Sequence, residues 1–275
     1  MLNILQVDVE DWYCDLDTGE WDKYEPRVVK ATERILSILN ETGNRATFFI
    51  LGFVAERFPE VVKKIDSEGH EVASHGYSHR RIMDQTPEEF REDVRRSIDI
   101  LEKIAGKKVR GYRAPQFTVV KETLWALEIL KREGLEYDSS VFPVKTPLYG
   151  IPDSLLFPYR VESDMSTSGD DFLEIPLSVY KIPLLGKNIP VAGGFYLRFF
   201  PYFFIRHALK KLNRLGNVAI CYIHPWDLDP GKPRIDSLHW YHYYRLKSTE
   251  QKFRRLMQDF KFISTREWIE NERRN

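Results

Sequence analysis

The chain has 275 residues, of which 43% are hydrophobic and 30% are charged, with 41 basic and 41 acidic side chains. This composition excludes disordered, collagen-like and low-complexity proteins, and the length allows a folded core without disulfide support. Zero net charge argues against broad nucleic-acid or anionic-membrane binding, which needs a clustered excess of Lys and Arg, and leaves room only for local basic patches.

Short apolar runs alternate with amphipathic stretches along the first half of the chain. The apolar runs predict strands at residues 4–9, 46–51, 71–74 and 109–112. The amphipathic stretches predict helices at residues 28–39, 58–69 and 86–106. The helix expected over 86–106 has the clearest start, because Thr86 and Glu89 form a capping box around Pro87 at the first helical position.

The same alternation continues in the second half. Strands are expected at residues 135–138, 173–176, 218–223 and 262–264, and helices at 121–132, 201–215 and from 265 onward. The Pro, Gly and Ser content of 143–171 predicts an elaborated loop within one domain. Seven or eight β–α units predict a single α/β domain over 1–275, a TIM-like parallel barrel with fewer strands or distorted closure. An open doubly wound sheet is the alternative, but no glycine-rich nucleotide motif supports it.

The N-terminus has no basic flank, long apolar stretch or cleavage site, so we expect no secretory signal and a cytoplasmic protein. Two cysteines, Cys14 and Cys221, make no disulfide scaffold and suit a reducing compartment. No apolar run reaches the ~20 residues of a transmembrane segment. The aromatic stretch from Phe195 to Phe204 could touch a lipid surface, which leaves a peripheral membrane location open, although core packing or an active-site wall explains the stretch better. A homodimer is also left open.

Polar side chains follow most of the expected strands, where a parallel barrel places its active site. In chain order these residues are Asp8, Glu10, Asp11, His75, His79, Arg113, Asp138, Glu174 and His224. Because the carboxyl ends of parallel strands meet at one end of a barrel, we expect these side chains to lie close together.

The His75-x-x-x-His79 motif lies where a strand passes into a loop, with Gly76 between the two histidines. Two neutral imidazoles can share one cation, and a carboxylate would complete the ligand set typical of hydrolytic metal sites. Two ordinary hydrogen-bonded histidines are the alternative interpretation.

Three acids, Asp8, Glu10 and Asp11, follow the first apolar strand. Strand alternation puts Asp8 and Glu10 on one face, where one could bind a metal while the other takes a proton from metal-bound water. Alternatively, these acids cap the next helix or pair with Lys and Arg.

Two further segments carry candidate catalytic groups. Arg113 lies at a strand end and could hold a catalytic carboxylate by a bidentate contact, or form an ordinary buried ion pair. His224 could donate a proton to a leaving group, while Trp226 offers a face on which a sugar ring could stack. Simple packing of the histidine against the tryptophan is the alternative.

Four segments together resemble, in order and spacing, the motifs of the polysaccharide deacetylases of carbohydrate esterase family 4, the NodB-homology domain. They are Asp8-x-Glu10, Ser74-His75-Gly76-x-x-His79, Arg113-x-Pro115 and Ile223-His224-Pro225. The finer resemblance is to the branch that holds a peptidoglycan deacetylase and an allantoinase-like amidohydrolase, and within it to deacetylases of exopolysaccharide and exosortase gene clusters. This likeness rests on Asp8-Val9-Glu10-Asp11-Trp12, Tyr137-Asp138-Ser139-Ser140 and Gly193-Gly194-Phe195-Tyr196.

The resemblance implies a distorted barrel that binds one divalent metal, usually zinc. It implies His75, His79 and a first-motif carboxylate as metal ligands. It also implies Asp8 as general base, Arg113 as its tether and His224 as general acid. The backbone N–H near Gln116 would bind the oxyanion, and we expect the substrate to contact Pro115, Gln116, Trp226 and Tyr196.

The chain departs from the family pattern at two points. The common first motif is Thr-Phe-Asp-Asp-Gly, so we take Glu10 as the carboxylate ligand from strand alternation, with Asp11 as the alternative that an ungapped alignment favours. The common motif that orients the acid histidine is not evident. Asp138 and Glu174 are candidates for that role by position only.

These observations predict a metal-dependent hydrolase of linear amide bonds that removes N-acetyl groups from amino-sugar units of a bacterial polysaccharide or its precursor. An N-acetylated glycan would be its substrate, and no nucleic-acid partner is expected. An allantoinase-like hydrolase of cyclic amides and a non-catalytic carbohydrate-binding protein are the alternatives.

Overall fold

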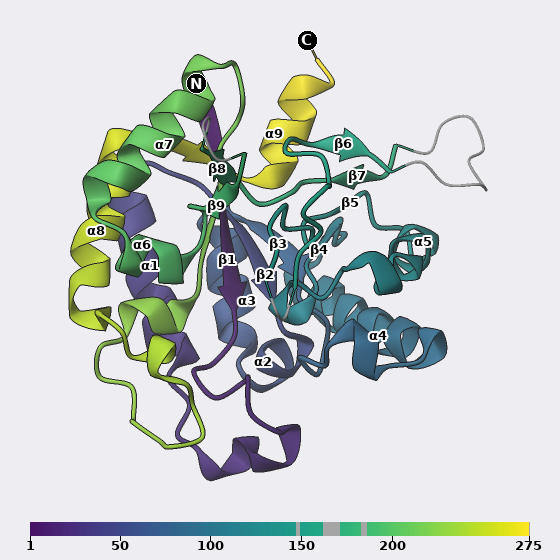
Figure 1. Cartoon of the computed structure of the whole chain (residues 1–275). Coiled ribbons are helices and arrows are strands. Elements are labelled where there is room, and N and C mark those ends of the chain that lie inside the picture. Colours follow the sequence, from purple (N-terminus) through teal and green to yellow (C-terminus); the bar gives the residue numbers. More distant parts are fainter. Residues whose placement is uncertain (147–148, 162–170, 183–185, 275) are drawn as a thin grey trace.

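The computed structural model describes residues 1–146, 149–161, 171–182 and 186–274, and a curled sheet surrounded by helices forms its centre (Figure 1). The strand order is β10-β1-β2-β3-β4-β5-β7-β6, and β11 pairs with β1. The strands of this sheet are β1 (Leu2–Val9), β2 (Thr47–Ile50), β3 (Glu71–Ser74), β4 (Gly111–Tyr112), β5 (Tyr137–Asp138), β6 (Tyr159–Arg160), β7 (Leu173–Glu174), β10 (Ile220–Ile223) and β11 (Lys261–Ile263). All pairs are parallel except β6 with β7. The expected α/β fold of a distorted barrel is confirmed.

Strand β1 is the centre of the sheet. It pairs with β10 along one edge, and along the other edge first with β11 over residues 2–4 and then with β2 over residues 6–9. All of its residues except Leu2 are buried. A strand that is covered on both edges and both faces usually has a nearly continuous apolar sequence. The polar side chains of Gln6 and Asp8 therefore lie inside the fold and need partners there.

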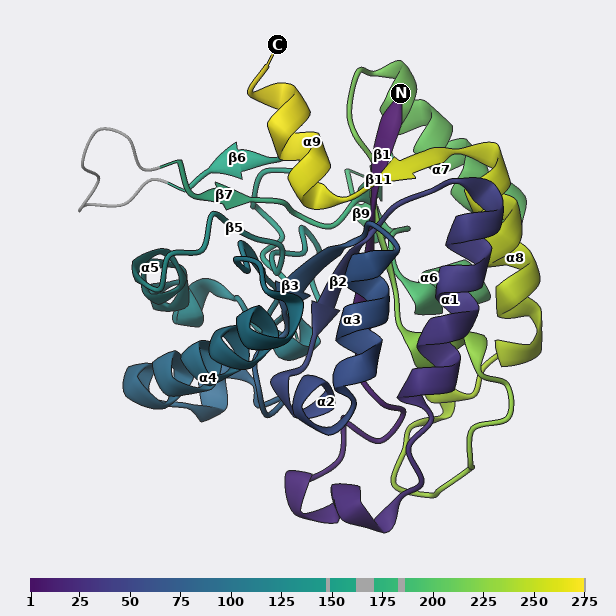
Figure 2. The same ribbon diagram turned by 180° about the vertical axis from the view of Figure 1, so that it is seen from behind.

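The helices lie around the sheet, and Figure 2 shows α1, α3 and α4 covering it from behind. The helices are α1 (Val28–Thr42), α2 (Gly52–Arg57), α3 (Pro59–Ser67), α4 (Pro87–Ala105), α5 (Trp125–Arg132), α6 (Gly194–Phe199), α7 (Tyr202–Arg214), α8 (Leu246–Asp259) and α9 (Thr265–Glu272). The predicted capping box of Thr86 and Glu89 opens α4. Within the described part of the chain, every helix is too short or too polar to cross a bilayer.

Several elements differ from the sequence-based prediction. The helix expected over 58–69 is α3, and α2, which was not predicted, precedes it as a separate helix because Phe58 has a non-helical backbone between the two. A 3-10 turn, η4 (Lys121–Thr123), precedes α5. Helices α6 and α8 were not predicted. In α8 the apolar residues that mark the buried face, Phe253, Leu256 and Met257, stand among Lys, Arg, Gln and Glu, which weakens the helical pattern.

The sheet ends at β10 on one side and at β6 on the other, so it forms an open half-barrel. Irregular backbone covers the outer edge of β10: the N–H of Ile220 donates to Ser178 Oγ at 2.8 Å, and that of Tyr222 to the carbonyl of Ala192 at 2.8 Å. An antiparallel hairpin of β8 (Val179–Lys181) and β9 (Asn188–Pro190) lies between these points in sequence. Of the expected loop at 143–171, residues 147–148 and 162–170 lie outside the described residues.

Candidate active site

The carboxyl ends of four strands bring the expected site residues together. Asp8 lies near the end of β1, and Glu10 follows it. His75 follows β3, Arg113 follows β4 and His224 follows β10. These strands run parallel in the same sheet, with β2 between β1 and β3, so their carboxyl ends lie at one end of the half-barrel.

Glu10, His75 and His79 form the one group among the described residues whose side chains could jointly hold a metal ion, with one ligand atom of each within 4.8 Å of the others. Glu10 Oε2 lies 2.7 Å from His79 Nε2 and 3.6 Å from His75 Nε2. All three side chains are buried. Two nitrogens and one oxygen converging on one point match a hydrolytic metal site that keeps positions open for water and substrate.

Backbone contacts fix the two histidines. His75 Nδ1 lies 2.8 Å from the carbonyl oxygen of Arg113, so this nitrogen carries the proton and Nε2 is free to bind a cation. Gly76 and His79 both adopt positive φ angles, 73° and 55°, and this turn brings the second imidazole back to the first. The Asp93 carboxylate holds the turn by accepting the N–H groups of Tyr77 and Ser78. The donor set therefore fits a divalent metal.

The electrostatics of the group favour a bound cation. Burial would raise the pKa of Glu10, but the charge of His79 and hydrogen bonds from His75 and His79 hold that pKa well below its ordinary value. Burial disfavours the charged form of His79, yet Glu10 and Asp15 raise the pKa of His79 to about 9. A buried, ionised carboxylate thus attracts positive charge at this point, as a metal centre requires.

Asp8 lies beside this group and is held by Arg113. Arg113 Nη1 donates to Asp8 Oδ1 at 2.7 Å, Nε donates to the carbonyl of Ser139 at 2.8 Å, and Nη2 donates to Gln6 Oε1 and Ser139 Oγ. The guanidinium also lies 4.5 Å from the ring centroid of Phe49. With the side chain fully buried, this network fixes one oxygen of Asp8 and leaves Oδ2 facing His224 at 3.9 Å.

Asp11 does not join the metal-type group. Its Oδ2 accepts the N–H groups of Arg27 and Val28 at 2.8 and 3.0 Å, and its Oδ1 accepts that of Trp12 at 2.8 Å. Asp11 thus serves the N-terminus of α1, where backbone N–H groups lack partners within the helix. Burial raises the pKa of Asp11 to about 6 despite these hydrogen bonds.

His224 is oriented by a residue that the sequence analysis missed. His224 Nδ1 lies 3.0 Å from Oδ2 of Asp227, in the 3-10 turn η5 (Pro225–Leu228), and Asp227 Oδ1 lies 3.0 Å from Arg198 Nη2. Burial opposes the charge of Asp227, but Arg198 and His224 lower its pKa to about 2. Burial alone would lower the pKa of His224, and the hydrogen bond to Asp227 with the charges of Glu10 and Asp227 raises it instead.

The suggestion that Asp138 or Glu174 orients His224 is wrong. These two carboxyl groups are hydrogen-bonded to each other. Asp138 also accepts from Ser140 Oγ at 2.6 Å, and Glu174 accepts the N–H of Val141 at 3.0 Å. Their position at strand ends did not identify the partner of His224, because the side chains of Asp138 and Glu174 instead bind the segment that follows β5.

Trp226 lies within the site wall, but it does not offer the free face expected for a sugar. One face stacks on His224 at 4.5 Å between ring centroids, and the ammonium of Lys232 lies 4.0 Å from the Trp226 ring centroid. Its Nε1 donates to Glu10 Oε1 at 2.9 Å. Trp226 is 7% exposed and contacts both His224 and Glu10 from the wall of the site.

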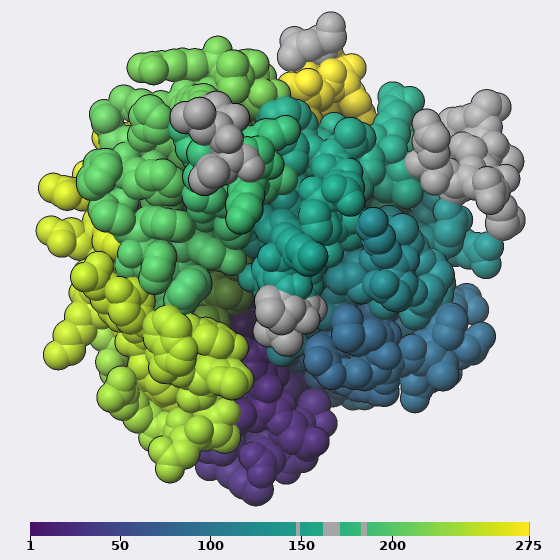
Figure 3. All heavy atoms as spheres, in the orientation of Figure 1, coloured from purple at the N-terminus to yellow at the C-terminus, as the bar shows by residue number. Residues whose placement is uncertain are grey.

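A cavity of about 490 Å³ opens over these groups, and Figure 3 shows it as a hollow among the purple, teal, green and yellow-green segments. Tyr196 lines it, as expected, with its hydroxyl 3.2 Å from that of Tyr149. Gln116 also lines it, with a positive φ of 52° and its side chain donating to Asp15 at 2.9 Å. Pro115, which has no N–H, opens the short turn η3 (Pro115–Phe117), so the first N–H of the turn is that of Gln116, while the N–H of Phe117 donates to the carbonyl of Ala114 at 3.1 Å.

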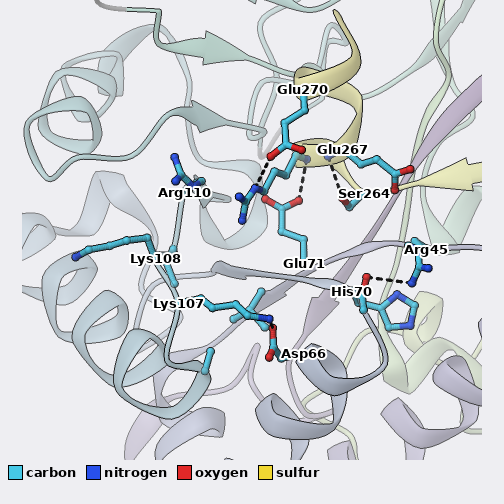
Figure 4. A pocket seen from close by; sticks show the side chains of 15 residues that line it. Arg45, Asp66, His70, Glu71, Lys107, Lys108, Arg110, Ser264, Glu267 and Glu270 are labelled. Atoms are coloured by element: carbon cyan, nitrogen blue, oxygen red, sulfur yellow. Dashed lines mark hydrogen bonds and ion pairs between the residues drawn. The ribbon is translucent and has the colours of Figure 1, made fainter. Parts of the chain in front are cut away.

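A second pocket, of about 320 Å³, lies around the amino ends of β3 and β4 (Figure 4). Its charged side chains face one another in pairs, as Lys107 does with Asp66 at 2.6 Å and Arg266 with Glu270 at 2.9 Å. This end of a parallel barrel contributes to stability, whereas catalysis belongs at the other end. The candidate site is therefore the cavity over Glu10 and His224.

Two protein families match different parts of the chain. Residues 11–137 match the polysaccharide deacetylase family, and residues 139–270 match a domain of unknown function, DUF3473. The first region contains both histidines of the metal-type group and Arg113, and the second contains His224 and Asp227.

Individual relatives agree with the first match. The chain is 37% identical over 98 residues to the peptidoglycan-N-acetylglucosamine deacetylase of Bacillus cereus, covering 35% of this chain and 36% of that protein. It is 32% identical over 108 residues to the peptidoglycan deacetylase of Helicobacter pylori, covering 39% of this chain and 36% of that protein. The chain thus spans little more than a third of the length of either relative.

Solved structures show a similar fold over nearly the whole chain. A Mycobacterium smegmatis protein assigned to the polysaccharide deacetylases superposes with a TM-score of 0.66 at 21% identity, covering 98% of this chain and 89% of that one. An allantoinase superposes with a TM-score of 0.60 at 15% identity, covering 94% and 85%. Residues 11–137 are therefore similar to the polysaccharide deacetylases and residues 139–270 to DUF3473, and the solved structures show that the fold is shared.

Proposed function

We propose that the protein hydrolyses the N-acetyl amide of amino-sugar units in a bacterial polysaccharide or its precursor, and that zinc is its metal. The observation that carries this proposal is the convergence of three chemical groups on one cavity. They are the Glu10, His75 and His79 group, the Asp8 carboxylate held by Arg113, and the His224 imidazole held by Asp227.

Glu10, His75 and His79 would hold the metal, which when bound supplies a Lewis acid for the amide carbonyl and for water. Asp8 is placed to take the proton of the attacking water, because Arg113 fixes its Oδ1 while Oδ2 faces the cavity. The N–H of Gln116 would stabilise the negative charge that develops on the carbonyl oxygen, and the position of Gln116 in the cavity lining supports this role.

His224 completes the reaction. The amide C–N bond breaks only when the departing nitrogen gains a proton, since an amine anion is a poor leaving group. With Nδ1 bonded to Asp227, His224 presents Nε2 on the side of Asp8 and Glu10, 3.9 and 3.8 Å away. His224 Nε2 donates its proton to the nitrogen, and acetate and a free amino sugar result.

We further propose that residues 1–275 act as one catalytic domain, although two families match its halves. Support comes from the cavity, since His75 and His79 belong to the first matched region and His224 to the second. Neither region alone contains both the metal-type group and the acid.

An acetylated chito-oligosaccharide tests the function. We expect acetate release that a chelator abolishes and added zinc restores, and we expect no release from a His75→Ala, His79→Ala double variant that still folds. The fold shared with an allantoinase makes cyclic amides the second candidate, so allantoin is the comparison substrate. Turnover of allantoin without any acetate release from glycans would contradict the proposal.

A further inference from the structure

Exposed aromatic rings cluster beside the mouth of the cavity. Phe199, Phe203 and Trp240 are 45%, 73% and 64% exposed. The partly exposed rings of Phe195 and Tyr244 link two of them: Phe195 lies 5.8 Å from Phe199 and 6.2 Å from Trp240, and Tyr244 lies 6.1 and 5.7 Å from the same two rings. Phe203 follows in the first turn of α7. We call these five residues the aromatic ridge.

Two cations, the buried Arg198 and the half-buried Lys252, hold the ridge in place. Arg198 Nη1 donates to the carbonyls of Tyr241, His242 and Tyr244, which fixes the segment with Trp240 against α6. Lys252 Nζ donates to three carbonyls at the end of α6, those of Leu197, Arg198 and Phe200. A surface that exposes aromatic rings on a backbone fixed this well is suited to binding.

The segment that carries the ridge is strongly basic, although the whole chain has no net charge. Between Phe199 and Lys247 the sequence has eight Lys or Arg residues and three Asp residues. The outer face of α7 presents Phe203, Arg206 and Arg214, which are exposed, and the half-buried Lys210 at helical spacing, and Arg206 pairs with Asp259 at 2.7 Å. Arg245 and Lys247 are exposed at the start of α8, next to Tyr244.

We propose that the aromatic ridge docks on the surface of an anionic lipid bilayer. Trp, Tyr and Phe rings insert at the level of lipid headgroups, and nearby Lys and Arg are attracted to anionic lipids. A glycan chain fits the ridge less well, because sugars stack on free aromatic faces, whereas Phe195 and Phe199 stack on each other. The ridge also continues onto α7, outside the lining of the cavity.

Docking would place the cavity mouth at the membrane, because Phe195 and Trp240 belong to both the ridge and the cavity wall. This consequence rests on the proposed function: the substrate would be an N-acetylated sugar on a lipid carrier. The sugar would reach Glu10 and His224 while its lipid stays in the bilayer.

Sedimentation with vesicles tests the docking without any need for activity. We expect the protein to bind vesicles of equimolar phosphatidylcholine and phosphatidylglycerol, to bind phosphatidylcholine alone at least about tenfold more weakly, and to dissociate as salt is raised. Phe203→Ala should weaken binding several-fold, and the charge reversal of Arg245 and Lys247 to Glu should do the same. Trp240 emission should shift to shorter wavelength on binding, a change absent in Trp240→Phe.

Leu124→Ala is the matched control, because Leu124 is 44% exposed next to α5, on the side of the molecule away from α6 and α7 (Figure 1). This variant should bind vesicles as the wild type does. Equal binding by the wild type, Phe203→Ala and the charge-reversed protein would overturn the proposal. Trp240 emission that responds to a soluble acetylated oligosaccharide but not to vesicles would assign the ridge to glycan instead.

A second measurement separates the docking from the proposed function. On an N-acetylated glycolipid in anionic vesicles, Phe203→Ala should be slower than the wild type, whereas both should deacetylate the soluble glycan equally. Vesicle binding by a wild type that releases no acetate from either substrate would refute the proposed function and leave the docking intact. Equal rates on the glycolipid would refute the lipid-linked substrate.

Discussion

His224 Nδ1 lies 3.0 Å from Oδ2 of Asp227, three residues further along the same turn, and Arg198 holds the other oxygen of Asp227 at 3.0 Å. This chain of contacts decides which nitrogen of His224 faces the cavity, since Nδ1 is occupied by the carboxylate. It also ties the proposed acid to the ridge segment, because Arg198 binds the carbonyls after Trp240.

Asp227→Asn should lower kcat on an acetylated oligosaccharide about a hundredfold, since loss of the carboxylate frees the orientation and weakens the protonation of His224. KM and metal content should change little, because Asp227 does not itself line the cavity and does not belong to the metal-type group. An activated acetyl ester, whose leaving group departs without a proton, should suffer less.

The control for this variant is Asp229→Asn. Asp229 is two residues away and pairs with Arg27, with Arg27 Nη2 2.9 Å from Asp229 Oδ1. The Asp229→Asn variant should retain the full kcat of the wild type. If both variants lose kcat equally, Asp227 acts on the fold of the turn and not on His224.

The two competing first-motif acids should respond differently to substitution. Glu10→Gln should weaken metal binding, because Glu10 supplies the oxygen beside His75 and His79. Asp11→Asn should keep the metal but lower the free energy of unfolding by about 1–3 kcal/mol, because an amide cannot accept all three backbone N–H groups. Elemental analysis and urea unfolding measure both effects. Metal lost in Asp11→Asn and kept in Glu10→Gln would favour the ungapped alignment.

Arg113→Lys should be inactive and less stable by about 2–4 kcal/mol, although it keeps the charge. An ammonium cannot reach Asp8, Gln6 and Ser139 at once in the planar geometry of the guanidinium. Asp8→Asn should also be inactive, yet it should lose less stability, since Arg113 keeps its contacts with Gln6 and Ser139. Urea unfolding of both variants provides the comparison, and a fully stable Arg113→Lys would contradict this account.

The sequence predicted the parts of the site that lie at the ends of regular strands. Asp8, His75 and His224 each follow a short apolar run, and strand ends in a parallel barrel converge for geometric reasons. Period-two alternation also placed Asp8 and Glu10 on one side of the chain, while Asp11 turned away to α1.

The missed residues owe their roles to tertiary packing. Arg198 reaches Asp227 only because α6 packs beside η5, and no local pattern marks that contact. Asp227 itself could have been found, because His224-Pro225-Trp226-Asp227 has the spacing of a turn in which the fourth side chain returns to the first. Trp226 was placed on the substrate side because a sequence does not show which aromatic faces are covered.

The last prediction concerns His70, a buried histidine at the far end of β3 from the candidate site (Figure 4). His70 Nδ1 accepts the N–H of Ala46 at 3.3 Å, and its ring lies 5.1 Å from that of Phe48. Burial, aided by the charge of Arg45, lowers the pKa of His70 to about 4. The folded protein therefore holds this imidazole neutral at pH values where the unfolded chain protonates it.

The sign of the pH effect follows from that depressed pKa. Above the ordinary histidine pKa of about 6.5, His70 is neutral in both the folded and the unfolded chain, and the free energy of unfolding has its full value. As pH falls toward 4, only the unfolded chain binds the proton at His70, so the free energy of unfolding decreases. At about pH 5 the loss should be about 2 kcal/mol. His70→Asn keeps an acceptor for Ala46 but cannot titrate, so its deficit relative to the wild type should shrink by that amount between about pH 7.5 and pH 5. His207→Asn, at an exposed histidine of α7, should show no such change in urea unfolding. A deficit of His70→Asn that stays constant across this range would mean that His70 is protonated in the folded protein as readily as in the unfolded chain.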